Sequence, residues 1–349
     1  MTTADILRLV RPNIAALAPY STARDEYQGS IGIFIDANEN PYDNGYNRYP
    51  DPRQRALKSR IAALKGTQPE HMFIGNGSDE AIDLCYRIFC RPGIDNALAI
   101  SPSYGMYRVA ADINDVEVRE VPLTAPSYGL PVEALLHAAD ENSKLLFLCS
   151  PNNPTGNAFP HDQIVQLLER FHGMVVVDEA YIDFADTPSL LHRLADYPNL
   201  IVLQTLSKAY GMAGLRLGLA FGSKEVMQLF ANIKYPYNIN LAGMEKAEEL
   251  LCRDVQSEID AIKSERTRVR EALATCPCVQ SVYPSDANFL LVKVTDADRL
   301  YDALIHEQII VRNRTRVPGC QDCLRITIGT PEENTRMLDI IRRYPVNIQ

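Results

Sequence analysis

The middle of the chain alternates short apolar runs with amphipathic stretches. The apolar runs at residues 145–149, 174–177 and 200–203 have the length of buried strands, and each ends in polar residues. Between the first two runs, residues 162–171 place apolar side chains at helical spacing. A strand, a helix and a second strand in that order predict a parallel sheet, because parallel strands need a crossover connection.

The polar residues that follow the three predicted strands are distinctive. The first strand is followed by Ser-Pro-Asn-Asn-Pro-Thr-Gly at 150–156, the second by Asp-Glu-Ala-Tyr at 178–181, and the third by Gln-Thr-Leu-Ser-Lys at 204–208. In a parallel sheet the carboxyl ends of the strands meet at one edge, and ligands bind beyond that edge. We therefore expect these three segments to face one ligand site.

The last third of the chain has a different pattern, which predicts a smaller α+β domain joined to the rest near residues 240–243. It is expected to form strands at 288–294, 308–311 and 324–328 and helices at 297–306 and 332–343. A chain of 349 residues is also long for a single hydrophobic core. We expect an N-terminal arm at 1–30 that is part of the small domain, a large domain at 31–243 and a C-terminal small domain at 244–349.

Composition and charge narrow the function classes. Hydrophobic residues make up 46% of the chain and charged residues 23%, which is ordinary for a globular protein. The net charge is -9 and the lysines and arginines are scattered, so we expect no nucleic-acid partner. No stretch approaches the roughly 20 apolar residues of a membrane helix, and the start of the chain has no signal-peptide core. We expect a cytoplasmic protein without a membrane partner.

The cysteines do not predict a metal or disulfide framework. Eight are spread along the chain, several of them in apolar runs, which favours reduced and buried thiols. Cys320 and Cys323 form a Cys-x-x-Cys pair, but the nearest further candidates, Cys276 and Cys278, have a spacing that is atypical of zinc sites. We therefore expect no metal site.

Lys208 is the first candidate for chemistry. A lysine is ordinarily a solvated surface residue, and residue type alone leaves that interpretation open. Here Lys208 follows a predicted buried strand and precedes a small, glycine-containing apolar stretch at 209–215. Such surroundings lower the pKa of a lysine and make its amine a nucleophile toward an aldehyde. The aldehyde of pyridoxal phosphate (PLP) is the group that such a lysine binds as a Schiff base.

The other two strand ends offer partners for a PLP ring. Asp178 has the charge to pair with the protonated ring nitrogen, although an aspartate after a strand is also a common helix N-cap. Asn153 and Tyr181 offer donors to the ring oxygen, although Asn153 also suits a turn before Pro154. Together with Lys208, these side chains predict a PLP site.

A phosphate site is predicted earlier in the chain. The segment 75–80, Gly-Asn-Gly-Ser-Asp-Glu, precedes an amphipathic helix, so its backbone amides can bind an anion at the helix N-terminus. The same segment is also an ordinary capping sequence. The candidates for binding the cofactor phosphate are Gly77, Ser78, Thr205, Ser207 and Arg216, and Asp79 is a further candidate for cofactor binding.

These motifs resemble those of the class II branch of the fold-type I PLP-dependent aminotransferases, with the segments 150–156, 178–181 and 205–218 as the main matches. Other segments are similar to those of the histidinol-phosphate aminotransferases: Leu-Ala-Pro-Tyr at 17–20, Asn-Glu-Asn-Pro at 38–41, Arg-Tyr-Pro-Asp at 48–51, Pro-Ser-Tyr-Gly-Met-Tyr at 102–107 and Leu-Arg-Ile-Thr-Ile-Gly-Thr at 324–330. The resemblance covers nearly the whole chain, in order. It implies an α/β fold whose large domain holds a mainly parallel seven-stranded sheet between helices, beside a smaller α+β domain.

The resemblance also implies roles for the cofactor-binding candidates. Lys208 would hold the cofactor covalently and then carry a proton, with Asp178 and Tyr181 as its catalytic partners. Tyr104 would stack on the cofactor ring, although a packed core tyrosine is its other interpretation. Tyr49 would reach the cofactor phosphate of a partner subunit, which implies a homodimer with a shared active site. On its own pattern, the segment around Tyr49 is also typical of a surface loop.

The substrates that the resemblance implies are histidinol phosphate and the pair of glutamate and 2-oxoglutarate, in histidine biosynthesis. Arg325 would hold the substrate carboxylate, because a guanidinium binds carboxylate or phosphate through two parallel hydrogen bonds. Arg312 would bind the substrate phosphate, and Tyr20 and Asn38 would line the same pocket. The loop at 313–322, with Arg314 and Arg316, is individual to this chain and bears on how that phosphate is enclosed.

Three alternatives remain open at this point. Threonine-phosphate decarboxylases share the fold, the lysine and a phosphorylated substrate, and aromatic aminotransferases also act on a substrate with a ring and an anion. PLP-binding folds also serve as ligand-sensing domains of transcription regulators, but only about 30 residues precede the large domain here. Arg312, Arg325 and the segment at 38–41 favour the histidinol-phosphate interpretation.

Overall fold

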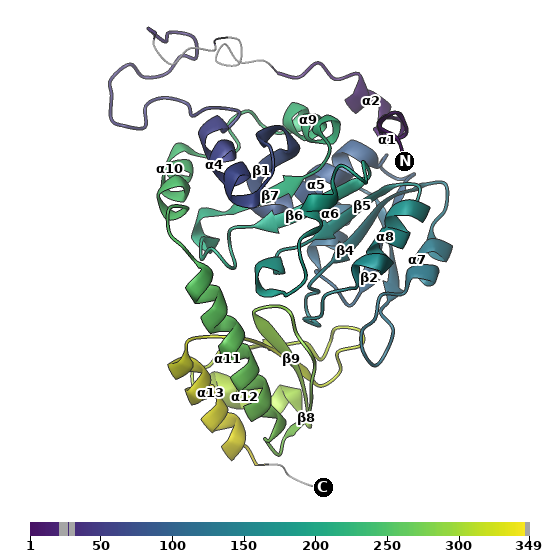
Figure 1. Cartoon of the computed structure of the whole chain (residues 1–349), viewed down its shortest axis with the longest axis vertical. Helices are drawn as coiled ribbons and strands as arrows, with labels where there is room; N and C mark the ends of the chain where they lie inside the picture. Colours follow the sequence, from purple (N-terminus) through teal and green to yellow (C-terminus); the bar gives the residue numbers. More distant parts are fainter. Residues whose placement is uncertain (21–26, 28–31, 346–349) are drawn as a thin grey trace.

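The computed structural model describes residues 1–20, 27 and 32–345, which form two lobes (Figure 1). The larger lobe contains a seven-stranded sheet with the strand order β1-β7-β6-β5-β4-β2-β3. Its strands are β1 (Met72–Asn76), β2 (Asn96–Ser101), β3 (Glu117–Pro122), β4 (Ser143–Cys149), β5 (Met174–Asp178), β6 (Leu200–Thr205) and β7 (Leu217–Phe221). Strands β2 to β6 are parallel, and β7 runs antiparallel to both β6 and β1. The predicted strands at 145–149, 174–177 and 200–203 are confirmed as β4, β5 and β6.

Helices cover both faces of this sheet. Successive residues of a strand point to opposite faces, so Leu146 and Val175 belong to one hydrophobic core and Phe147 and Val176 to another. The first core is covered by α4 (Arg55–Lys65), α7 (Val132–Ala138), α8 (His161–Arg170) and α10 (Leu241–Leu250). The second is covered by α5 (Gly77–Phe89), α6 (Met106–Ile113) and α9 (Lys224–Ile233). The mainly parallel sheet between helices confirms the expected fold class, and α8 confirms the helix predicted at 162–171.

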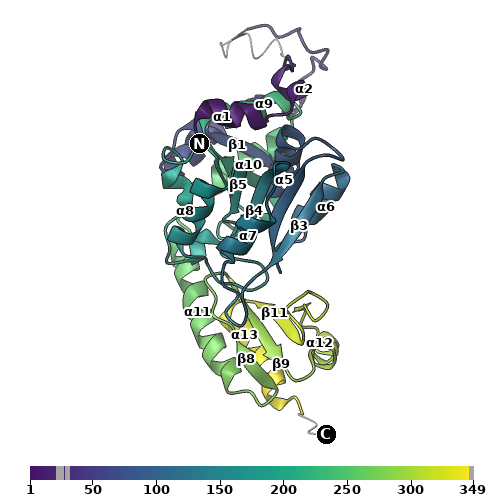
Figure 2. The same ribbon diagram turned by 90° about the vertical axis from the view of Figure 1, so that its right-hand side faces the viewer.

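The N-terminal segment packs on the large domain rather than on the small one. It forms α1 (Thr3–Leu9) and α2 (Pro12–Ala15), which lie at the α9 end of the large lobe (Figure 2). The apolar side chains of Ile6 and Val10 are buried in the same core as α5, which explains why this arm differs from the expected assignment to the small domain. Residues 32–50 then form neither helix nor strand; the segment loops out from the lobe (Figure 1) and returns to it at Tyr46 and Tyr49, which contact Glu245 and Tyr237.

The smaller lobe is an antiparallel sheet packed against helices. Its strand order is β10-β11-β9-β8, from β8 (Val279–Val282), β9 (Phe289–Val294), β10 (Arg312–Asn313) and β11 (Cys323–Thr327). Its helices are α11 (Gln256–Ala274), α12 (Ala297–His306) and α13 (Pro331–Arg343). The strand predicted at 308–311 is wrong: Gln308 has a positive φ of 61°, and strand pairing begins only at Arg312. The other predicted elements of this lobe are present as β9, β11, α12 and α13.

Helices α10 (Leu241–Leu250) and α11 (Gln256–Ala274) connect the two lobes. Met244, Ala247 and Leu251 belong to the core of the large sheet, so α10, which spans the predicted boundary at 243/244, packs with the large domain. The long helix α11 then leads into the small domain (Figure 2). The described residues also form four short 3-10 helices: η1 (Pro69–His71), η2 (Ile182–Phe184), η3 (Leu190–Arg193) and η4 (Ala213–Leu215). Of the helices described, none has the length and apolar character needed to span a membrane.

Candidate active site

A cavity of roughly 670 Å³ lies where the large sheet meets the small domain. Three of its lining residues follow the carboxyl ends of adjacent parallel strands: Asn153 after β4, Tyr181 after β5 and Lys208 after β6. The small domain contributes arginines from β10, β11 and the loop between them. The segments predicted to face one ligand site are therefore brought together.

Lys208 is accessible in this cavity and has a lowered pKa. Its Nζ lies 5.6 Å from the centre of the Tyr181 ring. No ion pair with Lys208 is found among the described residues, 1–20, 27 and 32–345. Partial burial, and then the positive charge of Arg325, lower the pKa of the amine. Both effects favour the neutral form, which is the nucleophile and the base.

Asp178 is a buried carboxylate at the end of β5. It is 2% exposed, and it accepts hydrogen bonds from the Tyr107 hydroxyl at 2.8 Å and from the Ala180 N–H at 3.1 Å. Burial raises its pKa to about 6. The short helix that follows begins only after Tyr181, so Asp178 is not a helix N-cap. A buried carboxylate in this state favours a cationic partner, which fits the protonated nitrogen of a pyridine ring.

Tyr107, which the sequence analysis did not name as a site residue, contacts Asp178. It is 1% exposed, and its ring stacks on Phe147 with centroids 4.9 Å apart. This packing aims the hydroxyl at Asp178 and fixes the carboxylate. The available signal was its position three residues after Tyr104, at the start of α6.

The N-terminus of α5 fits the phosphate group of the cofactor. The N-cap residue Asn76 provides no side-chain cap, and no acceptor for the amides of Ser78 and Asp79 is found within the described structure. Gly77 has φ +72°, and a Cβ there would lie 2.6 Å from Nη2 of Arg216, so the glycine makes room for the guanidinium. Free amides at a helix N-terminus beside an arginine bind anions.

Strands β6 and β7 complete this cradle. Ser207 N–H donates to the Thr205 hydroxyl at 3.1 Å, which places both residues in the turn that leads to Lys208. A Cβ on Gly218 would lie 2.0 Å from the backbone carbon of Gly77 and from the nitrogen of Ser78. Glycine at 218 therefore allows β7 to approach the start of α5 closely.

Tyr104 contacts both the start of α5, through Asp79, and Tyr107, the neighbour of Asp178. Its hydroxyl donates to Asp79 at 3.0 Å, and its ring meets Tyr107 edge-on with centroids 5.7 Å apart. Tyr104 also lines the cavity, so its ring is accessible from the ligand side rather than fully packed in the core. Stacking on the cofactor stays a prediction.

The substrate side of the cavity is formed by arginines. Arg325 donates from Nη1 to the Asn153 side-chain oxygen and lies 5.3 Å from the centre of the Phe289 ring. Arg312 is its direct neighbour across β10 and β11. Arg314, which was left outside the predicted site, also lines the cavity.

Three predicted site residues do not line the Lys208 cavity of this chain. Tyr20 is 76% exposed and lines a separate hollow beside α4 and α9. Asn38 and Tyr49 line another hollow, in which Tyr49 stacks on Tyr237 with centroids 4.4 Å apart. The structure does not bring these three residues to Lys208, and their roles stay predictions.

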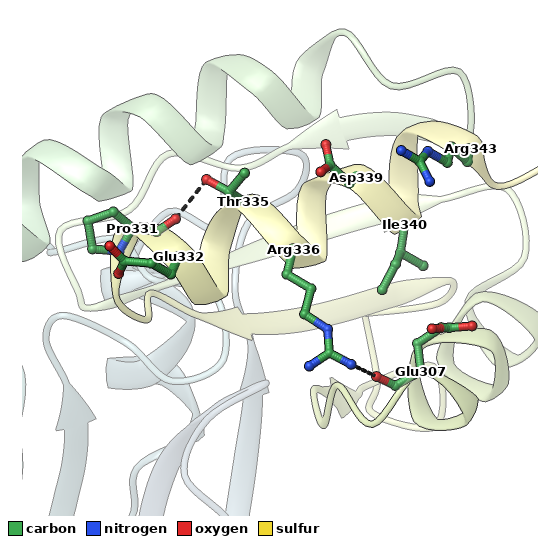
Figure 3. Close-up of a pocket in the computed structure, with 8 residues that line it drawn as sticks. All are labelled: Glu307, Pro331, Glu332, Thr335, Arg336, Asp339, Ile340 and Arg343. Atoms are coloured by element: carbon green, nitrogen blue, oxygen red, sulfur yellow. Dashed lines mark hydrogen bonds between the residues drawn. The ribbon is translucent and has the colours of Figure 1, made fainter.

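A further hollow on the outer face of α13 has no features of a cofactor site (Figure 3). Its charged side chains alternate in sign along the helix, and two of its hydrogen bonds are local: Thr335 to the Pro331 carbonyl at 2.7 Å and Arg336 to the Glu307 carbonyl at 2.7 Å. It contains no lysine and no aromatic ring. In the part of the chain that the structure describes, no group of three or more His, Cys, Asp or Glu side chains is placed to hold a metal ion.

Comparison with known proteins gives consistent matches. Residues 34–341 match the family described as aminotransferase class I and II. A histidinol-phosphate aminotransferase of Parabacteroides distasonis is 53% identical over 340 residues, which cover 97% of this chain and 98% of that protein.

Solved structures agree with the sequence matches. The histidinol-phosphate aminotransferase from Clostridium acetobutylicum has a TM-score of 0.78 and 26% identity, over 84% of this chain and 90% of that one. The enzyme from Sinorhizobium meliloti, solved in complex with pyridoxal-5'-phosphate, has a TM-score of 0.75 and 26% identity, over 84% of this chain and 83% of that one. The family match over residues 34–341 and the near full-length relatives show that this chain belongs to the class I and II aminotransferases, among relatives named histidinol-phosphate aminotransferase.

Proposed function

We propose that this enzyme transfers the amine of L-histidinol phosphate to 2-oxoglutarate, which gives imidazole acetol phosphate and L-glutamate, a reaction of histidine biosynthesis. The observation that carries this proposal is the pair of Arg312 and Arg325, directly opposite one another at the Lys208 cavity. One substrate carries a phosphate and the other carries carboxylates, and a guanidinium binds either group. Relatives that are half identical over nearly the whole chain are named for this activity.

PLP is the cofactor that we propose for this site. When bound, PLP supplies an electron-withdrawing ring that weakens the bonds at the α-carbon of the substrate. Asp178 would stabilise the protonated ring nitrogen, and its buried position makes this charge pairing strong. The free amides at the start of α5 and the guanidinium of Arg216 fit the phosphate group.

Lys208 is the residue that we propose to move the proton. Its neutral Nζ would accept a proton from the α-carbon of the substrate and would then donate that proton to the cofactor. The lowered pKa of this amine favours the neutral form. Tyr181 is buried beside Lys208. Its hydroxyl would donate to the ring oxygen of the cofactor, as would Asn153, and the two residues would together fix the position of the ring.

The most direct test is a panel of half-reactions. The PLP-loaded enzyme would be mixed separately with histidinol phosphate, phenylalanine and threonine phosphate, and the conversion of the cofactor to its aminated form followed by absorbance. We expect fast conversion with histidinol phosphate. Faster conversion with phenylalanine would favour an aromatic aminotransferase, and release of carbon dioxide from threonine phosphate would favour the decarboxylase.

Replacing Arg325 by alanine is expected to slow both half-reactions, those with glutamate and with histidinol phosphate, by about 100-fold each. The reason is that removal of one partner of a buried charge-assisted contact weakens binding by roughly 2–5 kcal/mol. The measurement is kcat/KM for each half-reaction. Arg325→Lys is the matched variant, since it keeps the charge and loses the two parallel hydrogen bonds. Loss of only one half-reaction would contradict a shared anion pocket.

We further propose a homodimer in which Tyr49 reaches the partner's cofactor phosphate. Tyr49 is 48% exposed and lies apart from the Lys208 cavity of its own chain. Nearby, Ile33 and Ile35 are 92% and 90% exposed on a segment without helix or strand. Exposed apolar side chains at this density are typical of an interaction surface.

Tyr49→Phe is expected to weaken retention of PLP about tenfold, because the ring keeps its stacking on Tyr237 but the hydroxyl no longer reaches the phosphate. The measurement is the dissociation constant of PLP from the dialysed enzyme, with oligomeric state from sedimentation. Tyr46→Phe is the matched control, since that exposed hydroxyl bonds only to Glu245 in the described structure. An active monomer with full cofactor would refute the shared site.

We place this enzyme in the cytoplasm. The support for this placement is that all eight cysteines are free thiols, seven of them buried. Reduced thiols are typical of proteins in reducing compartments.

A further inference from the structure

Three guanidinium groups share one face of the small sheet. Arg312 in β10 pairs with Arg325 in β11, so the two side chains stand on the same side. The N–H of Arg314 donates to the Cys323 carbonyl at 2.8 Å, so the pairing with β11 continues one residue beyond the end of β10. Because side chains at i and i+2 of a strand point the same way, Arg314 joins the other two on the face that lines the Lys208 cavity.

Arg314 is held there without an anionic partner. Its Nε is buried and has no hydrogen-bond acceptor, and the same is true of the Nε of Arg325. Burial, and then the charges of Arg325 and Arg312, lower the pKa of Arg314 to about 10. Between residues 32 and 345, no ion pair joins any of the three arginines to a carboxylate. Glu120, which also lines the cavity, lies 3.3 Å from Arg108.

Like charges placed side by side in a partly buried site destabilise one another unless an anion neutralises them. A carboxylate has two oxygens, and one bidentate arginine can bind both of them. A phosphate monoester carries close to two negative charges at neutral pH and has three terminal oxygens, so it can engage further donors. The third guanidinium therefore matches a phosphate better than a carboxylate.

We propose that Arg314 is a specificity-determining residue that binds the phosphate of a phosphorylated amine together with Arg312. This inference rests on the proposed function and deepens it, because it assigns the preference for a phosphate to one residue of the loop at 313–322. Arg325 remains available to both substrates, and Arg314 discriminates between them.

Arg316 provides a matched control within the same loop. The chain turns at residues 315 and 316, and Arg316 leaves the sheet face, is exposed and does not line the cavity. Arg314→Gln and Arg316→Gln therefore remove the same charge from the same loop, but only the first removes it from the cavity.

The experiment measures both half-reactions of the PLP-loaded enzyme for the two variants. For Arg314→Gln we expect kcat/KM with histidinol phosphate to fall about 30-fold and kcat/KM with glutamate to fall less than threefold. Arg316→Gln should change neither by more than twofold. If Arg314→Gln does not fold, Arg314→Lys serves in its place, with a smaller loss confined to histidinol phosphate. Equal losses for the two substrates, or no loss with histidinol phosphate, would overturn the proposal.

A second readout separates this inference from the proposed function. Inorganic phosphate should inhibit the glutamate half-reaction of the loaded enzyme by occupying the arginines, and Arg314→Gln should raise its inhibition constant about tenfold. If the unmodified enzyme does not react with histidinol phosphate, the proposed function fails, and this inhibition constant still decides the role of Arg314. An inhibition constant unchanged by Arg314→Gln would overturn that role.

Discussion

Replacing Lys208 by alanine is expected to slow amine transfer on the order of 10⁴-fold, the upper end of what one positioned acid–base group contributes. The amine is both the covalent attachment point for PLP and the base at the α-carbon in the proposed reaction. Its accessible position in the cavity and its lowered pKa suit it to both tasks. The measurement is a single-turnover half-reaction with histidinol phosphate, followed by cofactor absorbance.

Lys208→Arg is the matched variant for this prediction. It keeps the positive charge but does not release its proton, so it should be as inactive as the alanine variant. Borohydride reduction of the loaded enzyme should fix PLP to the peptide that contains Lys208. Labelling of another lysine, or substantial turnover by either variant, would mean that the attachment site is wrong.

Asp178→Asn is expected to lower the rate of the same half-reaction on the order of 10³-fold. An amide cannot hold the ring nitrogen in its protonated form, and removal of one partner of a buried charge pair weakens it by roughly 3–5 kcal/mol. The control is Tyr107→Phe, which removes one donor to the carboxylate and keeps its charge. We expect that variant to lose about tenfold or less. An Asp178→Asn enzyme with near-normal rates would contradict the ring-nitrogen role.

The pH dependence of stability gives a readout for Asp178 that does not depend on catalysis. Burial raises the pKa of Asp178 from 3.8 to about 6, so the folded chain without cofactor binds a proton that the unfolded chain releases. The corresponding stabilisation, on the order of 3 kcal/mol, is fully present below pH 3.8 and is lost as the pH rises through about 6. Asp178→Asn should flatten this part of the curve of unfolding free energy against pH.

Much of the large domain could be predicted because its strands are buried on both faces. A continuous apolar run such as that in β5 has one consistent interpretation, and the carboxyl ends of parallel strands meet at one edge whatever the loops do. Lys208, Asp178 and Asn153 were therefore grouped correctly from local pattern alone. The helix at 162–171 was equally clear, since its apolar positions repeat at helical spacing.

The small domain shows where local pattern is insufficient. Residues 308–311 are apolar, but Ile310 is 74% exposed while Ile309 and Val311 pack against the core of the small lobe without strand pairing. Hydrophobicity alone does not reveal whether a segment makes a hydrogen-bonded ladder. β10 has two residues, which is too short for any periodic signal.

Side-chain direction explains why the positions of Tyr107 and Arg314 at the site were not predicted. Tyr107 points at Asp178 because its ring is stacked on Phe147, forty residues further along the chain. Arg314 belongs to the cavity only because its backbone continues the pairing with β11. The position of Tyr49 relative to a ligand depends, in our proposal, on a second chain, which no pattern within one sequence specifies.

The close contact at Gly218 has a consequence for the gene. Every missense change in codon 218 adds at least one carbon, and that carbon would overlap the backbone of Gly77 and Ser78. Four codons earlier, Gly214 has no atom within 4 Å of the position that a Cβ would occupy. Two glycine codons in one short stretch therefore differ in their tolerance of mutation: alleles altered at 214 can drift, whereas alleles altered at 218 are removed by selection wherever growth requires this enzyme.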